Sequence, residues 1–111
     1  MQLSEIVRRL ALDVRAAPDA LAVEVTGGYA CDLLSYVMAN AKAGDLWITI
    51  QGHPNIVAVA ALVGLAGIVL VEGAQAEAAT FEKATQEGIP ILVTHDSAYT
   101  IAGRLYELGI R

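Results

Sequence analysis

The sequence predicts a three-layer α/β/α domain built on a mostly parallel sheet. In its second half, short apolar strands alternate with helical stretches, and the connections between them are only a few residues long. These strands lack polar alternation, which is typical of parallel strands buried on both faces. Parallel strands joined through helices cross over right-handed and place helices against the sheet. At 111 residues, the chain is expected to form one domain, residues 1–111.

The first half of the chain carries weaker signals, mainly caps and turns. From residue 1 to residue 44 we expect a helix after a Ser4 N-cap, strands at 12–14 and 21–25, a break at Gly27-Gly28, and a helix between an Asp32 cap and Gly44. The sequence leaves open whether the first 24 residues join the main sheet.

The second half gives clearer boundaries. We expect strands at 46–50, 67–71 and 90–94, and helices at 54–63, 76–86 and from an Asp96 cap to Gly109. Pro54 suits a first helical turn, where its missing N–H would be unpaired in any case. The helix at 54–63 has no polar face, so it must be covered on more than one side.

The uncharged apolar run at 56–71 raises the question of a membrane segment. It contains 16 residues, including Gly64 and Gly67, whereas a spanning helix needs about 20 apolar residues. We therefore interpret it as a helix, a glycine stop and a strand. The formal net charge of −5 also argues against nucleic acid or an anionic membrane surface as the main partner.

The amino-acid composition bears on the association of the chain and on its cellular compartment. Hydrophobic residues make up 56% of it and charged residues 17%, a surplus that favours burial between copies of the chain. The single cysteine, Cys31, excludes an internal disulfide framework, and the N-terminus does not resemble a secretory signal. We expect a cytoplasmic protein.

Polar segments follow three predicted strands, at the edge where ligands bind to open parallel sheets. The candidate ligand-binding residues are Gly52, His53, Glu72, Gly73, His95 and Asp96. Two of these segments lead into helices, whose free N–H groups attract anions. The alternative is that they are turn and cap residues only. A small enzyme using His95 and Asp96 as an acid–base pair ranks last, because adjacent residues at a helix start rarely point at one atom.

Several chemical motifs are missing from the chain. There is no GxxxxGK[ST] loop, no GxGxxG after a strand and no GxSxG elbow, so we expect neither a kinase nor another enzyme, and no cofactor. A zinc site would have to combine Cys31, His53, His95 and Asp96, and no paired CxxC or HxxxH spacing supports it. No metal is therefore predicted.

From about Val25 to Gly109 the chain resembles the DRTGG domain family. The resembling stretches are VTGGYACDLLSYVMANAKAGDLWITIQGHPNIVAVAALVGLAGIVLVEG and GIPILVTHDSAYTIAGRLYELG. Gln51-Gly52-His53 stands where the family has Gly-Asp-Arg, and Val71-Glu72-Gly73 stands where it has Thr-Gly-Gly. The family fold is similar to the N-terminal domain of HPr kinase, which lacks the kinase P-loop.

The resemblance implies a non-enzymatic regulatory or ligand-sensing module, often homodimeric, with adenine nucleotides as ligands suspected from CBS-linked relatives. The other ligand class that we expect for the polar strand ends is a different anionic metabolite. The alternative is a docking module for a redox enzyme system of the hydrogenase type, without a small-molecule ligand. The sequence names neither the ligand nor the partner.

Overall fold

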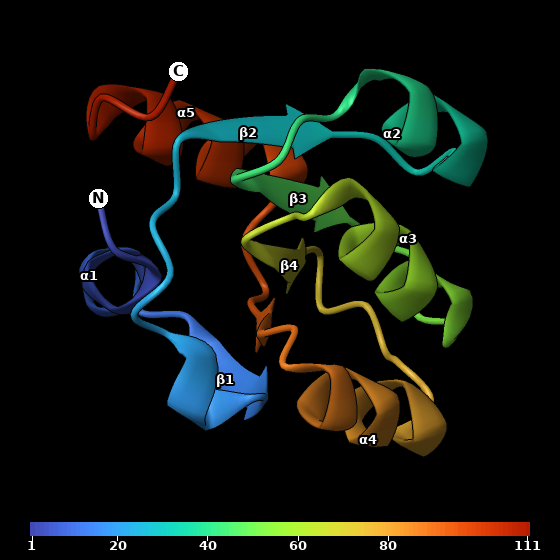
Figure 1. Cartoon of the computed structure of the whole chain (residues 1–111). Helices are drawn as coiled ribbons and strands as arrows, with labels where there is room; N and C mark the ends of the chain where they lie inside the picture. The colour runs from blue at the N-terminus through green and yellow to red at the C-terminus, as the bar shows by residue number, and fades with distance from the viewer.

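Five strands form one sheet in the order β1-β5-β4-β3-β2 (Figure 1). The computed structural model describes residues 1–111, and the strands are β1 (Asp13–Ala16), β2 (Gly27–Ala30), β3 (Asp45–Thr49), β4 (Gly67–Leu70) and β5 (Ile91–Val93). Strands β2 to β5 are parallel, and β1 pairs antiparallel with β5. The predicted mostly parallel sheet is confirmed, and the N-terminal region does join it.

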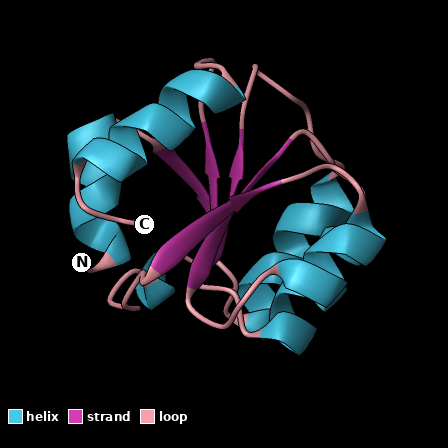
Figure 2. Ribbon diagram, turned by 90° about the horizontal axis from the view of Figure 1, so that it is seen from above, coloured by secondary structure: helices cyan, strands magenta, loops and turns pink.

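Helices cover both faces of the sheet, which completes the predicted three layers (Figure 2). They are α1 (Leu3–Leu10), α2 (Leu34–Asn40), α3 (Asn55–Val63), α4 (Ala78–Glu87) and α5 (Ala98–Glu107), with a short 3-10 turn at Pro18–Ala20. Helices α2, α3 and α4 lie side by side on one face, whereas α1 and α5 lie on the other. Apolar α3 is the middle helix of its layer, as its missing polar face requires.

The sheet separates two apolar cores. Successive residues of a strand point to opposite faces, so Trp47 and Ile68 enter the core under α2–α4 while Leu46 and Val69 enter the core under α1 and α5. Both sets are buried. This double burial explains why the sequence of these strands shows no polar alternation.

The segment 21–25 is not the strand that its β-branched residues predict. Its backbone instead forms hydrogen bonds with the first residues of the chain: Leu3 N–H donates to Val23 O and Val25 N–H donates to Met1 O, both at 2.9 Å. Only an isolated bridge between Gln2 and Glu24 results. Helix α1 correspondingly begins at Leu3, without a Ser4 cap.

Two further expectations near β2 are wrong. Gly27-Gly28 does not interrupt the chain but begins β2, where a Cβ on Gly27 would lie 2.5 Å from Asp45 Oδ1. Asp32 does not cap α2, because its carboxylate accepts hydrogen bonds from Thr49 Oγ1 at 2.8 Å and Ile50 N at 3.0 Å. These contacts bring the end of β2 against the end of β3.

The apolar run at 56–71 forms a helix, a glycine stop and a strand, as its glycines predict. Helix α3 ends at Gly64, which adopts the left-handed conformation with φ 82°, and β4 begins at Gly67. No helix of the structure is both long and apolar enough to cross a membrane.

Candidate functional site

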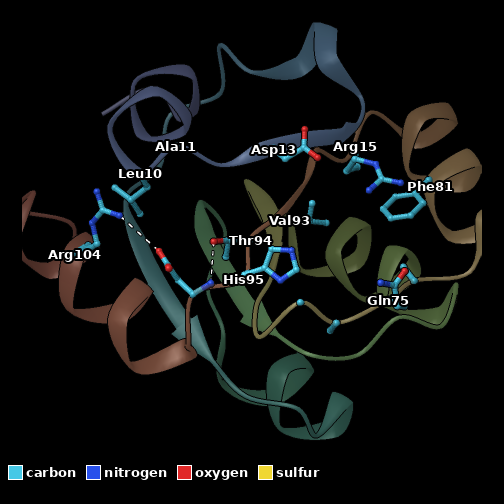
Figure 3. A pocket seen from close by; sticks show the side chains of 14 residues that line it. Leu10, Ala11, Asp13, Arg15, Gln75, Phe81, Val93, Thr94, His95 and Arg104 are labelled. Carbon is cyan, nitrogen blue, oxygen red and sulfur yellow. Dashed lines mark hydrogen bonds and ion pairs between the residues drawn. The ribbon is translucent and has the colours of Figure 1, made fainter.

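A cavity of about 540 Å³ opens at the carboxyl ends of β4 and β5, beside the start of β1 (Figure 3). The chain leaves β4 toward α4 on one face of the sheet and leaves β5 toward α5 on the other. Connections that diverge in this way open a crevice outside the strand ends. The lining residues are Leu10, Ala11, Asp13, Arg15, Gly73, Ala74, Gln75, Ala76, Phe81, Val93, Thr94, His95, Asp96 and Arg104.

Arg15 reaches this cavity from an irregular position in β1. The pairing of β1 with β5 shifts register between Val14 and Ala16, so Arg15 is the extra residue of a β-bulge. Bulges re-aim side chains and recur beside functional sites. The Arg15 guanidinium carbon lies 4.9 Å from the ring centroid of half-buried Phe81 on α4. None of the four ion pairs of the chain includes Arg15.

His95 faces Arg15 and Phe81 from the opposite wall of the cavity (Figure 3). Two backbone hydrogen bonds hold its loop against the β4–α4 loop: Glu72 N–H donates to Asp96 O at 2.9 Å, and Gly73 N–H donates to Thr94 O at 3.0 Å. Gly73 has φ +69°, and a Cβ there would lie 2.8 Å from His95 Nδ1. The glycine therefore makes room for the imidazole ring.

Arg104 closes the end of the cavity next to α1. Its Nη1 lies 3.7 Å from Asp96 Oδ2, and its Nη2 donates to the carbonyl oxygen of Arg9 at 2.9 Å. Both of these interactions are with groups of the chain itself. Arg104 thus fastens α5 and the β5–α5 loop to the C-terminal end of α1.

Two further polar side chains line the cavity. The side chains of Asp13 and Gln75 are exposed, and neither takes part in an ion pair. Besides the Arg104–Asp96 pair, the cavity is therefore lined by the guanidinium of Arg15, the imidazole of His95, the carboxylate of Asp13, the amide of Gln75 and the ring of Phe81 (Figure 3). Such a set can bind a ligand that combines an anionic group, hydroxyl or amino donors and a planar ring.

The structure gathers Gly73, His95 and Asp96 of the predicted site residues in this cavity. Glu72 is left out: it adopts φ 62° and lines a separate hollow on the α5 side of the sheet. Both residues are hydrogen-bonded through their N–H groups to the β5–α5 loop, but Gly73 lines the cavity on one side of this junction and Glu72 the hollow on the other.

Gly52 and His53 lie at the start of α3, outside the cavity. The carbonyl oxygen of Gly52 accepts from Thr80 Oγ1 at 2.7 Å and from Glu77 N–H at 3.2 Å, and a Cβ on Gly52 would collide with the carbonyl of Gln75. His53 is exposed, and its Nδ1 accepts from Asn55 N–H at 3.1 Å. Both residues support neighbouring backbone.

Asp96 is not the N-cap of α5. Ser97 occupies that position, and its Oγ accepts from Thr100 N–H at 3.1 Å. Asp96 is turned toward Arg104, and its own N–H donates to Thr94 Oγ1 at 3.1 Å.

Sequence reasoning missed Asp13, Arg15 and Phe81. Nothing in the sequence states that β1 pairs with β5, and the bulge that presents Arg15 arises only from that pairing. The one available signal is the pair of opposite charges inside a short strand, in the stretch Asp13-Val14-Arg15. No three His, Cys, Asp or Glu side chains come together as a metal-binding group.

A second, mostly apolar hollow, which includes the one lined by Glu72, runs along α5 on the same face of the sheet as α1. It comprises two cavities of about 240 and 480 Å³ that share Ala30 and Ile48. Small residues of α5, Ala98 and Ala102, form its wall. Tyr99 of the same helix is 90% exposed.

Comparison with known proteins supports the fold. No protein-family model and no curated protein matches the sequence. The structure is similar to the crystal structure of the CBS and DRTGG domains of the regulatory region of Clostridium perfringens pyrophosphatase, complexed with the activator diadenosine tetraphosphate. The TM-score is 0.72 at 16% sequence identity, over 94% of this chain and 45% of that one.

This chain therefore has a DRTGG-like α/β fold, as the sequence resemblance implies. It spans less than half the length of the pyrophosphatase regulatory region that it matches. At this identity the similarity concerns the fold.

Proposed function

We propose that this chain is a non-enzymatic regulatory module that senses an anionic nucleotide, first of all an adenine nucleotide, as a cytoplasmic homodimer. Residues 1–111 would act as one DRTGG-like domain. The cavity between β1, α4 and the β5–α5 loop carries the proposal, because Arg15, Phe81 and His95 meet there from three separate elements. The regulatory and nucleotide-bound character of the similar pyrophosphatase region supports it.

The chemistry of the cavity fits a nucleotide. Arg15 has no carboxylate partner, so its guanidinium is free to bind phosphate oxygens. The ring of Phe81 offers a stacking surface for a base. A volume of about 540 Å³ is within the ordinary range for small-molecule sites, about 300–1,000 Å³.

A thermal denaturation experiment tests this function. Adenosine, AMP, ADP, ATP, diadenosine tetraphosphate and inorganic phosphate are each added to the purified chain. A ligand at a hundred times its dissociation constant stabilises the fold by about 2.7 kcal/mol, which raises Tm by on the order of 10 °C. We expect at least one nucleotide to do so.

The decisive variant is Arg15→Ala, with Arg111→Ala as its matched control. Arg111 also stacks on an aromatic ring, with its guanidinium carbon 4.5 Å from the Tyr106 centroid, but it lies outside this cavity, in the apolar hollow along α5. Loss of a hydrogen bond to a charged group costs about 1.5–3 kcal/mol, so Arg15→Ala should weaken binding roughly 10- to 100-fold. Equal effects of the two variants would place the ligand elsewhere.

The proposed dimer uses the other edge of the sheet. Strand β2 pairs on one side only, and the apolar hollow beside it is lined by the exposed Tyr106 of α5. Sedimentation of the purified chain tests this part independently of any ligand.

The second candidate is a docking module for a redox enzyme system of the hydrogenase type. The apolar hollow along α5 is the observation that favours it, because exposed apolar patches mark protein interfaces. Under this alternative no nucleotide stabilises the chain, and a double Arg15→Ala and His95→Ala variant still binds the partner.

A further inference from the structure

We infer that the cavity selects nucleotides that carry a single phosphate, a nucleoside monophosphate, over di- and triphosphates. This inference rests on the proposed function and adds the ligand class to it. The observation behind it is the charge distribution of the lining: two carboxylates, Asp13 and Asp96, share the cavity with two guanidinium groups, Arg15 and Arg104.

Of the two guanidinium groups, only that of Arg15 has neither an ion-pair nor a hydrogen-bond partner in the chain, so it binds a phosphate without first giving up a contact. Arg104 already interacts with the carboxylate of Asp96 and the carbonyl of Arg9. Arg15 makes only the contact with the Phe81 ring. One guanidinium fork matches one phosphate group, and further phosphates would have no cationic partner of the same strength.

Asp13 adds a penalty for the additional phosphates. It precedes Arg15 by two residues on β1, lines the same cavity and has no cation within ion-pair distance. Like charges in a shared, partly enclosed site repel each other. An ionised carboxylate only accepts hydrogen bonds, and acidic side chains bind ribose hydroxyls in other nucleotide sites. Asp13 therefore favours the ribose and opposes a long phosphate chain.

Gln75 and Phe81 supply the place for the base. They lie on the same side of the cavity as Arg15, in the β4–α4 loop and on α4 (Figure 3). A glutamine amide can accept a hydrogen bond from the N6 amino group of adenine and donate one to its N7 atom. When Arg15 turns to a phosphate, the face of the Phe81 ring that it covers becomes available for stacking.

Isothermal titration at constant ionic strength and without divalent cations tests the ligand class. The probes are adenosine, AMP, ADP, ATP and inorganic phosphate. We expect AMP to bind at least tenfold more tightly than each of the other four. Arg15→Ala should reduce the difference between AMP and adenosine to less than threefold, because the phosphate then has no partner.

The substitution that isolates the selectivity is Asp13→Asn, and Asp19→Asn is its matched control. Both aspartates are exposed, but Asp19 lies in the 3-10 turn outside the cavity. Asp13→Asn should weaken AMP and strengthen ATP, so that their affinity ratio falls at least fivefold, while Asp19→Asn leaves the ratio unchanged. Thermal unfolding of each variant shows that it is folded.

The outcomes separate the two proposals. If ATP binds as tightly as AMP and Asp13→Asn leaves the ratio unchanged, the monophosphate inference is overturned and nucleotide sensing stands. If no nucleotide binds, or if Arg15→Ala has no effect on the nucleotide that does, the proposed function and the inference both fail.

Discussion

The two edges of the sheet are built differently. At one edge, β1 carries Asp13 and Arg15 and a β-bulge, and it runs antiparallel to its neighbour. At the other edge, β2 has the sequence Gly-Gly-Tyr-Ala, without a charge, and pairs in regular parallel register with β3. Charges and bulges are the usual means by which proteins prevent an edge strand from pairing with another chain.

From this difference we expect the two edges of the sheet to have separate tasks. The β1 edge is protected against pairing, and its charged, bulged residues face a cavity. The β2 edge has no such protection, and the apolar hollow along α5 adjoins it. We therefore expect ligand binding at the β1 edge and association of two copies at the β2 edge.

The largest expected effect concerns the attachment of β2 to the sheet. Trp47 is fully buried in β3, and its indole N–H donates to the carbonyl of Cys31 just after β2, at 2.8 Å. Trp47→Ala should lower the free energy of unfolding by about 3–5 kcal/mol, because it leaves a cavity and an unpaired carbonyl. Urea denaturation at constant protein concentration measures this.

The exposed Tyr36 serves as the control for Trp47. Tyr36→Ala should change stability by less than about 0.5 kcal/mol. A similar loss in both variants would show that burial of the indole is not what holds the β2 edge.

The next effect in size concerns association. Ala30 is exposed on β2, so Ala30→Lys would place two like charges opposite each other across a two-fold axis. The dissociation constant of the dimer should rise at least about 100-fold, equivalent to about 2.7 kcal/mol. Analytical ultracentrifugation of this variant and of Ala22→Lys, at an exposed loop position, makes the comparison. A dimer that tolerates Ala30→Lys would have its interface elsewhere.

A smaller effect is expected at Gly73, where the cost of the backbone conformation can be distinguished from an effect on ligand binding at the β1 edge. Gly73 and Gly88 both have φ near +70°, but a Cβ meets His95 only at Gly73, while at Gly88 nothing lies within 4 Å. Alanine at either position should cost about 1–2 kcal/mol of stability from the left-handed conformation. Only Gly73→Ala should also weaken nucleotide binding, roughly tenfold, because it displaces the imidazole. Equal affinities of the two variants would remove His95 from the site.

The smallest expected effect concerns the N-terminus of α5, the helix that contributes residues both to the cavity and to the apolar hollow. Ser97→Ala should cost about 1 kcal/mol in thermal or urea unfolding, since the N-cap hydrogen bond to Thr100 is lost. Asp96→Ala should cost less, because it removes only a partly exposed ion pair of 3.7 Å with Arg104. The reverse order would restore Asp96 as the cap that the sequence suggests.

Local patterns in the sequence were sufficient for most of the second half of the fold. Strands β3, β4 and β5 and helices α3, α4 and α5 all lie within about two residues of the predicted boundaries. The reason is physical: continuous apolar strands, proline at a first turn and glycine at a helix end act over a few neighbouring residues. The same patterns sufficed for the prediction of three layers.

The first half shows where local patterns mislead. Residues 21–25 have the composition of a strand, yet their hydrogen bonds go to the N-terminus, and Asp32 has the composition of a cap, yet its carboxylate binds the end of β3. In both cases hydrogen bonds to a partner distant in sequence replace the local structure that the composition predicts.

The candidate site likewise contains residues that local patterns predicted and residues that only long-range contacts bring to it. The sequence by itself placed Gly73, His95 and Asp96 at the carboxyl ends of the strands, because parallel strands end at one edge of a sheet. Only the tertiary structure decided that Arg15 and Phe81 meet them there, and that Glu72 does not. The pairing of β1 with β5, its bulge and the two bonds between neighbouring loops join residues far apart in the chain, and no local pattern encodes such contacts.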